Sequence, residues 1–193
     1  SVEFARRHHV PLHVRSSFTW EPGTWVVEEE SSMEEAVVTA VTDDTSESKV
    51  TVSHVPDRPG VAARLFRELA LKGVNIDMIV QNTSQSGTTD ISFTVEKSEA
   101  AAAVAACEGV RHELQIGSVS ADDGVGRVTL IGAGMKSSPG ITAKMFETLA
   151  ALDINIEMIS TSEIKISIVI DEKYTELAVR VLHKAFGLEQ AAA

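Results

Sequence analysis

Hydrophobic and polar positions recur along this chain at a fixed offset of 80 residues. The stretch 57–84 (DRPGVAARLFRELALKGVNIDMIVQNTS) returns as 137–163 (SSPGITAKMFETLAALDINIEMISTSE). The shared positions include a Pro-Gly pair, a Phe, a Leu-Ala pair, an Asn-Ile pair and a Met-Ile pair, always in the same order. Self-similarity at one constant spacing indicates that a single structural unit occurs twice.

Each copy predicts a turn, a helix and a strand. Pro59 is expected at the first helical position with Asp57 as its cap, and Gly73 is expected to end the helix. Residues 74–80 then alternate between apolar and polar side chains, which predicts a strand. The apolar face of the two helices consists of Val61, Leu65, Phe66 and Leu69 in the first copy and of Ile141, Met145, Phe146 and Leu149 in the second.

The same periodicities predict the rest of both units. The first unit reads as strand 49–55, helix 59–72, strands 74–83 and 89–95, helix 98–108 and strand 111–118. The second reads as strand 127–131, helix 139–152, strands 154–160 and 163–170, and helix 173–186. The second unit lacks a last strand, which would leave an open sheet edge. We expect the strand-like segment 36–42, followed by a loop at 43–48, to fill this place, so that the first unit is inserted in the second.

Residues 1–32 do not belong to the repeat. Helix 2–9 and strands 12–16 and 24–27 are expected there, and the acidic, Ser-rich stretch 28–35 reads as a linker. Histidines 8, 9 and 13 invite a metal interpretation. No matching carboxylate or Cys cluster accompanies them, and cations are favourable at a helix C-terminus, so we expect no metal site.

Composition narrows the function classes. The net charge of −11 and pI of about 5.0 argue against a nucleic-acid surface, which would be basic. Cys107 is the only cysteine, so no internal disulfide forms, and its Ala-rich surroundings predict a small core residue. No apolar run approaches the ~20 residues of a membrane span, and the first residues lack the apolar region of a signal peptide. We therefore expect a cytoplasmic protein with no nucleic-acid or membrane partner.

The two βαββαβ units, each with a Pro-Gly turn and an Asn-Ile-acid-Met-Ile motif, resemble ACT domains. The motifs VNIDMIVQNTS, GTTDISFTV, VTLIGAGM, SSPGITAKMFETLA and NIEMISTSEIKISIVI are similar to the regulatory region of aspartate kinases. The resemblance implies an α+β fold with two ferredoxin-like ACT domains in tandem, the first inserted in the second. Its expected boundaries are 1–32 for the end of an amino-acid-kinase domain and linker, 49–119 for the first ACT domain, and 36–43 plus 126–187 for the second.

The resemblance also implies a function. Aspartate kinases phosphorylate L-aspartate with ATP in the first step towards lysine, threonine and methionine, and threonine or lysine bound at ACT interfaces inhibits them. The family's catalytic lysine and Gly-Gly-Ser segment have no counterpart here, so we expect a regulatory chain that is inactive alone and holds no cofactor, ATP and Mg²⁺ belonging to the kinase domain. Its expected partners are the effector, a second copy and a catalytic alpha subunit. Met33 falls where some bacteria start a separate regulatory beta subunit.

A free amino acid presents a carboxylate and an ammonium, and the first repeat offers groups for both. A helix N-terminus attracts the carboxylate, and Gly60 permits close backbone approach. Asp77 can hold the ammonium, while the amide of Asn75 donates and accepts hydrogen bonds. The same residues also fit a helix cap, a turn and a solvated strand. The candidate threonine site consists of Asp57, Arg58, Pro59, Gly60, Val61, Ala62, Asn75, Ile76, Asp77 and Gln81.

The second repeat carries altered polar groups, which predict either a different ligand or packing against a partner chain. Its candidate residues are Ser138, Pro139, Gly140, Ile141, Asn155, Ile156, Glu157 and Thr161. The segment 132–135 (GAGM) matches only part of a dinucleotide fingerprint and is expected to be a tight turn. No nucleophile and base fall in a recognisable arrangement. The alternative to a ligand sensor is an ACT-type dimerisation module that binds no ligand.

Overall fold

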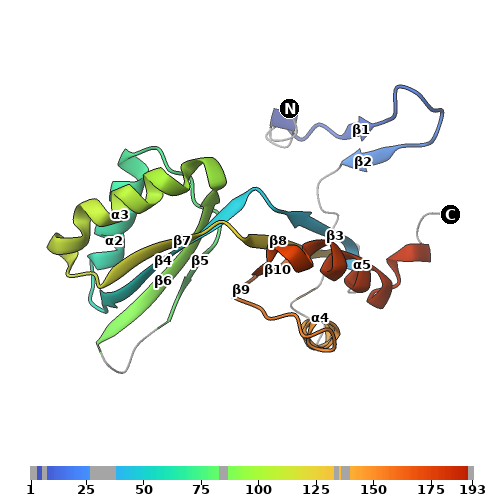
Figure 1. The fold of residues 1–193 in the computed structure, drawn as a ribbon. Coiled ribbons are helices and arrows are strands. Elements are labelled where there is room, and N and C mark those ends of the chain that lie inside the picture. Colours follow the sequence, from blue (N-terminus) through green and yellow to red (C-terminus); the bar gives the residue numbers. More distant parts are fainter. Residues whose placement is uncertain are drawn as a thin grey trace. The chain divides into compact units, whose positions relative to one another are not determined.

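The protein is described from a computed structural model, which defines residues 4–5, 8–26, 38–82, 87–132, 135 and 140–190. The chain divides into two compact units, residues 1–35 and residues 36–193. Figure 1 shows the ribbon of both. No helix within the described ranges is long and apolar enough to cross a membrane.

The N-terminal unit contains a small antiparallel hairpin. Strand β1 (Leu12–Val14) pairs with β2 (Thr24–Val26). The His13 ring stacks on the Trp25 ring with centroids 4.1 Å apart, and His13 Nε2 lies 2.6 Å from the Pro22 carbonyl oxygen. The two predicted strands are confirmed. Of the predicted helix 2–9, residues 4–5 are helical and 8–9 form a turn, and the remainder lies outside the described residues, as does the linker 28–35.

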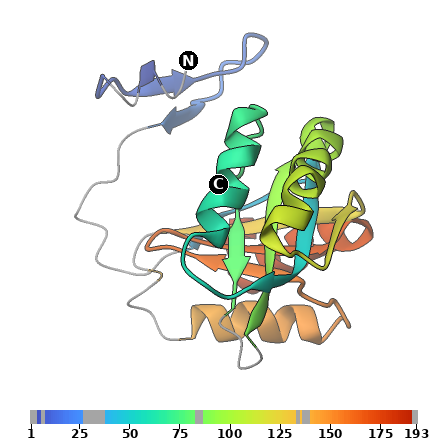
Figure 2. The same ribbon diagram turned by 90° about the vertical axis from the view of Figure 1, so that its left-hand side faces the viewer.

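The main body consists of two four-stranded antiparallel sheets. The first has strand order β5-β6-β4-β7 and the second β3-β8-β10-β9. The strands are β3 (Val38–Asp44), β4 (Glu47–Pro56), β5 (Ile79–Gln81), β6 (Thr88–Glu96), β7 (Ser118–Asp122), β8 (Val125–Gly132), β9 (Met158–Thr161) and β10 (Lys165–Asp171). The helices are α2 (Val61–Leu71), α3 (Ala100–Leu114), α4 (Ile141–Ala150) and α5 (Thr175–Ala185), with short 3-10 turns at Lys97–Glu99, Glu172–Tyr174 and Leu188–Gln190. Helices α2 and α3 lie together on one face of the first sheet (Figures 1 and 2).

Strand β3 completes the second sheet, although it precedes the whole first repeat in the sequence. It pairs antiparallel with β8, with Val41 opposite Leu130 and Thr42 opposite Thr129. The expected insertion of the first unit in the second is therefore confirmed. Residues 36 and 37 of the predicted strand lie outside the described residues.

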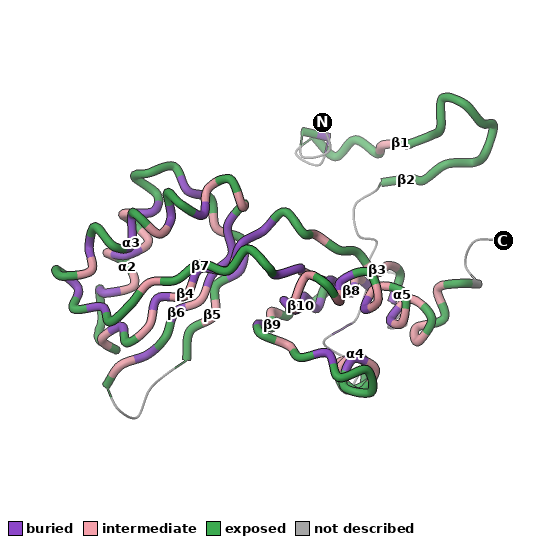
Figure 3. The backbone as a smooth tube through the Cα atoms, viewed as in Figure 1, coloured by how far each residue is buried: buried purple, intermediate pink, exposed green. Residues whose placement is uncertain are grey.

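Each repeat has its own hydrophobic core between its sheet and its helices. In the first, Val52 and Phe93 from the sheet meet Leu65 and Leu69 from α2. In the second, Leu130 and Ile168 meet Met145, Leu149 and Leu182. All nine side chains are fully buried, and Figure 3 marks buried positions along the strands and helices of both repeats. Alternation in the strands and helical spacing in the helices thus build the layers that the sequence predicts.

Two predicted elements of the first repeat are wrong. The strand expected over 111–118 does not form there, because α3 continues to Leu114 and β7 begins only at Ser118. Cys107, Val110 and Leu114 lie at helical spacing and are buried, so core packing carries the helix past Gly109. The loop expected over 43–48 shrinks to two residues, because the Asp44 carboxylate accepts hydrogen bonds from the backbone N–H and hydroxyl of Ser46 and closes a tight turn.

The strand expected over 74–83 is regular only from Ile79 to Gln81, although side-chain exposure alternates from Val74 to Gln81 as expected. The predicted hairpin loop 85–87 falls almost wholly outside the described residues.

The predicted start of the first helix is also wrong. Helix α2 begins at Val61, two residues after Pro59, and no side chain caps it. Gly60 occupies the N-cap with φ of 92°, in the left-handed region where a side chain would be strained. Helix α4 repeats this geometry with Gly140 at φ 110°, while Ser138 and Pro139 lie outside the described residues. The predicted end of α2 agrees, because Gly73 follows the last turn at φ 72°.

Gly126 in β8 has no room for a side chain. A Cβ there would overlap the hydroxyl of Thr175, a residue that is only 3% exposed. We expect Gly126→Ala to lower the free energy of unfolding by about 1–3 kcal/mol, the usual range for overpacking. Gly109→Ala in α3 meets nothing within 4 Å and should raise it by about 0.5–1 kcal/mol. Urea denaturation of both variants checks this, and equal changes would contradict it.

Cys107 is a core residue, as predicted, and is fully buried. Burial raises the pKa of its thiol to about 11, and the neighbouring Glu108 charge acts in the same direction. Because the thiolate is the reactive form, we expect modification by a thiol reagent at pH 8 to be at least about 100-fold slower in the folded protein than in urea. Absorbance during reaction with a disulfide reagent measures both rates, and equal rates would show that the side chain is accessible.

Candidate functional site

The loop before α2 lies at one end of the first sheet. The backbone N–H of Asp57 donates to the Gly87 carbonyl at 3.0 Å, which fixes the loop beside the beginning of β6. Asp57, Arg58, Pro59 and Gly60 are exposed, Ala62 is half-buried and Val61 is buried under the helix. Exposed backbone at an uncapped helix N-terminus, next to an arginine, is a place where a carboxylate binds favourably.

Asn75 and Asp77 lie near the other end of the same sheet. The Asp77 N–H donates to the Thr94 carbonyl at 3.2 Å, and the Asn75 N–H donates to the Glu99 carboxylate at 3.1 Å. Gly87 and Thr94 are seven residues apart along β6, which corresponds to roughly 20 Å. One free amino acid cannot bridge this distance. Within one chain, therefore, the structure does not bring the predicted carboxylate and ammonium groups together.

The remaining predicted residues follow the same plan. Gln81 is exposed and lies between the two ends, opposite Ile91. Ile76 is half-buried and packs against the first core. In the second repeat Gly140 and Ile141 begin α4, and Asn155, Ile156 and Glu157 precede β9, where the Glu157 N–H donates to Val169 at 2.8 Å. Thr161 is exposed and pairs with Ile166.

Asp77 and Glu157 meet basic residues of the opposite repeat. The carboxylate of Asp77 forms an ion pair with Arg127 of β8, and that of Glu157 forms one with Lys49 of β4. Lys49 and Arg127 hold matching positions, as the sequences KVTV and RVTL show. The two ion pairs are therefore related by the pseudo-symmetry of the duplication.

A third ion pair follows the same symmetry. Lys97 and Glu172 are the first residues of the two matching 3-10 turns, and their side chains approach to 2.8 Å. Between the charges lies a small apolar cluster of Met78, Val125, Met158 and Val169, all buried, with Val80 packed against it. The starts of β5 and β9 thus meet across a junction with an apolar centre and a charged rim.

Arg127 is the centre of charge at this junction. Its guanidinium lies 3.1 Å from Asp44 and 3.1 Å from Glu47, in addition to Asp77. Burial raises the pKa of the Glu47 carboxyl, a shift that Arg127 opposes. Hydrogen bonding from Ser46 lowers the pKa of Asp44, and Arg127 adds to this. The single positive charge of the guanidinium therefore offsets only part of the negative charge of the three carboxylates.

The sequence prediction missed Arg127, Lys49 and Glu47. The signal was present, because the first strand of each repeat contains a basic residue followed by Val-Thr. Only the fold shows that each of these cations faces the acid of the other repeat. No group of three or more His, Cys, Asp or Glu side chains suited to a metal was found in the part of the chain that the structure defines.

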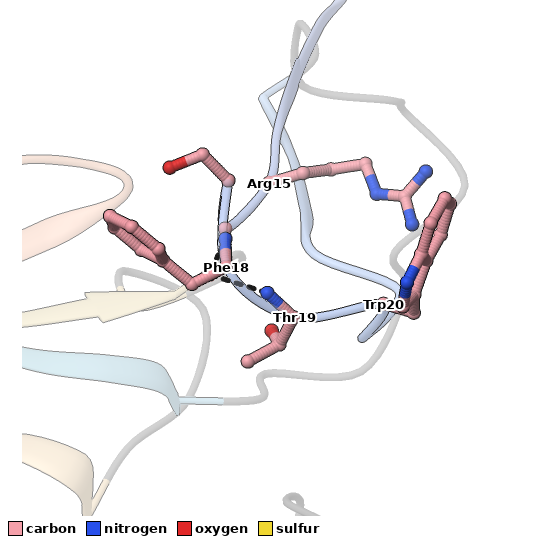
Figure 4. Close-up of a pocket in the computed structure, with 6 residues that line it drawn as sticks. Arg15, Phe18, Thr19 and Trp20 are labelled. Atoms are coloured by element: carbon pink, nitrogen blue, oxygen red, sulfur yellow. Dashed lines mark hydrogen bonds between the residues drawn. The ribbon is translucent and has the colours of Figure 1, made fainter.

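The N-terminal unit contains a shallow pocket in the loop between β1 and β2. Figure 4 shows the side chains of Arg15 and Trp20 pointing towards each other while Phe18 points away. The Ser16 hydroxyl accepts from the N–H groups of Phe18 and Thr19 at 3.1 and 3.2 Å. Phe18 and Trp20 are almost fully exposed, so this loop does not enclose a ligand.

Comparison with known proteins agrees with the fold. A family model of the ACT domain matches residues 49–109 and 128–186. Aspartokinase of Mycobacterium tuberculosis is 49% identical over 191 residues, which cover 97% of this chain and 45% of that protein. Aspartate kinase of Pseudomonas putida is 44% identical over all of this chain and 47% of its own length.

Solved structures give the same picture. A crystal structure of aspartokinase alpha and beta subunits superposes with a TM-score of 0.74 at 45% identity, covering 78% of this chain and 99% of that one. The ligand-free regulatory subunit of aspartate kinase from Thermus thermophilus gives a TM-score of 0.74 at 37% identity with the same coverage.

The chain belongs to the ACT domain family, with two such domains in tandem. The relatives that match this chain over 97–100% of its length are aspartokinases, which confirms the resemblance seen in the motifs. The chain spans about half the length of these relatives.

The shifted carboxyls around Arg127 predict opposite pH effects. The pKa of Glu47 is raised above its ordinary 4.5 in the folded protein. The contribution of this group to the free energy of unfolding is therefore complete below about pH 4.5, and it is lost as the pH rises through the pKa of the folded state. We expect Glu47→Gln to be more stable than the wild type at pH 7, with no difference below about pH 4. The pKa of Asp44 is lowered below 3.8, so its stabilisation is present above that value and disappears as pH falls.

Asp44→Asn is therefore the matched control and should be less stable than the wild type at pH 7. Urea unfolding of the three proteins from pH 3.5 to 8 tests both signs. Two variants that change stability in the same direction at pH 7 would refute the assignment.

Proposed function

We propose that this chain is the regulatory part of an aspartate kinase and that it binds threonine, with lysine as the second candidate, to inhibit the enzyme by feedback. The proposal rests on the 45% identity between this chain and the matched chain in the structure of aspartokinase alpha and beta subunits, over 99% of the matched chain. The chain itself transfers no phosphate in this proposal. A catalytic alpha subunit binds ATP, Mg²⁺ and aspartate, and the location is the cytoplasm.

The ligand site forms between ACT domains of two chains. The uncapped start of α2, with Gly60 and Arg58, receives the carboxylate of the amino acid. Asp77 and Asn75 lie roughly 20 Å away in the same chain, so the ammonium must be held by these residues of a second copy. A homodimer is therefore part of the site, and binding favours the dimer arrangement in which the two ends meet.

The second candidate is a dimerisation module without a ligand. It is favoured by Asp77, because the carboxylate of this residue already has a partner within the chain in Arg127. The two candidates differ in one observable: only the sensor gains stability from a free amino acid.

Thermal unfolding in the presence of millimolar threonine tests the proposal, with lysine and methionine as parallel ligands. A ligand at 100 times its dissociation constant stabilises by about 2.7 kcal/mol, which raises the midpoint by several degrees. We expect threonine to raise the midpoint and Asn75→Ala to abolish the rise. The matched change in the second repeat, Asn155→Ala, should leave it intact.

Sedimentation in the same buffers should show a dimer that threonine favours. If no amino acid changes the midpoint or the association state, the sensor proposal fails and the dimerisation module remains. If Asn155→Ala also abolishes the rise, the ligand is not confined to the first repeat.

A further inference from the structure

We propose that Arg127 is an internal competitor for the ligand: without effector it pairs with Asp77, and the ammonium of the bound amino acid must displace it. This inference rests on the proposed function, in which Asp77 holds that ammonium. It makes a residue of the second repeat a determinant of affinity in the first.

The positions of both side chains suit an exchange. Arg127 is 19% exposed and lies within the junction, whereas Asp77 is 45% exposed and can be approached from solvent. A ligand cation can therefore reach the open side of the Asp77 carboxylate while the guanidinium remains on the protein side. Both cations offer N–H donors to the same oxygens, so they compete for one acceptor.

Arg127 does not become unpaired when it leaves Asp77. Asp44 and Glu47 stay within 3.1 Å of the guanidinium, and Glu47 is almost completely buried. A guanidinium carries five donors in a planar fork and can serve two carboxylates at once. The exchange therefore replaces one charge pair by another and leaves no buried cation without a partner.

Lys49 provides the contrast within the same junction. It pairs with Glu157, its one acidic partner among the described side chains, and it occupies the position in β4 that Arg127 occupies in β8. Replacing Lys49 weakens the junction in a similar way but leaves the pair of Asp77 and Arg127 in place. It therefore separates competition at Asp77 from a general loosening of the contact between repeats.

The consequence is a link between the two repeats. Occupation of Asp77 by a ligand frees Arg127 from one of the three pseudo-symmetric ion pairs that join the sheets. Binding in the first repeat then changes the charge contacts of the second, without any ligand in the second repeat itself. Such a differential contact is what a ligand needs in order to shift an equilibrium between two arrangements.

The test measures threonine affinity by calorimetry for the full chain, one double variant and one control variant. Arg127→Gln combined with Glu47→Gln removes the competitor together with the buried carboxylate that it neutralises, so that the variant keeps its fold. Lys49→Gln, at a residue outside both candidate ligand sites, is the control. We expect the first variant to bind threonine about 3- to 10-fold more tightly, the range of a partly exposed charge pair, and the control to match the wild type.

A second measurement follows the Arg127 side chain itself in the wild-type protein. The Arg127 Nε–H signal, assigned in nitrogen-15 NMR spectra by its loss in Arg127→Lys, should move when threonine is added. In Asp77→Asn it should already lie near the ligand-bound position and change little.

The outcomes separate the two claims. If the wild type binds threonine but the Arg127 double variant binds equally or more weakly, or if the Arg127 signal does not move, the competition is refuted and the sensor function stands. If the control binds as tightly as the Arg127 variant, a loosened junction explains the gain and the competition is again refuted. If no protein of the set binds threonine, the proposed function fails and this inference fails with it.

Discussion

The contact of one guanidinium with three carboxylates sets the relation between the two repeats. Arg127 contacts Asp44 and Glu47, which flank the turn before β4. It also contacts Asp77, which lies just before β5. The four buried side chains of the apolar cluster, Met78, Val125, Met158 and Val169, contribute about 1.5–3 kcal/mol each when they leave water. Their packing is non-directional, however, whereas the ion pair with Arg127 supplies buried Glu47 with a cation and so favours this arrangement of the repeats.

The same contact decides where a ligand can bind. Because the starts of β5 and β9 face each other at the junction, the loop before α2 lies at the far end of its sheet from it. Asn75 and Asp77, which suit an ammonium, lie at the junction between the two repeats of one chain. The loop before α2, which suits a carboxylate, lies away from this junction. An amino acid can use both kinds only when another ACT domain brings the complementary end. In the proposed sensor, ligand binding and association are therefore one equilibrium.

The sequence predicted most of the fold because the fold is local and repeated. The apolar faces of α2 and α4 and the alternation in β6 are periodic signals that tertiary packing reinforces, and the missing strand of the second repeat located β3. The errors lie where packing overrides local signals: α3 continues through Gly109 because Val110 and Leu114 complete its core face. The candidate site combined groups that precede and follow α2, and a helix of 11 residues separates its two ends by about 16 Å. The basic residue at the matching position of each repeat is visible in the sequence, but the pairing of Arg127 with Asp77 is not, because this contact exists only when two sheets meet.

The insertion of the first repeat in the second makes the junction unavoidable. Strand β3 is held in the second sheet by β8, and after a two-residue turn the chain enters β4 of the first sheet. It returns from β7 to β8 through residues 123 and 124, where the Gly124 carbonyl accepts the Glu172 N–H. Two very short connections therefore cross between the sheets side by side. They keep the starts of β4 and β8, with Lys49 and Arg127, next to the opposite repeat.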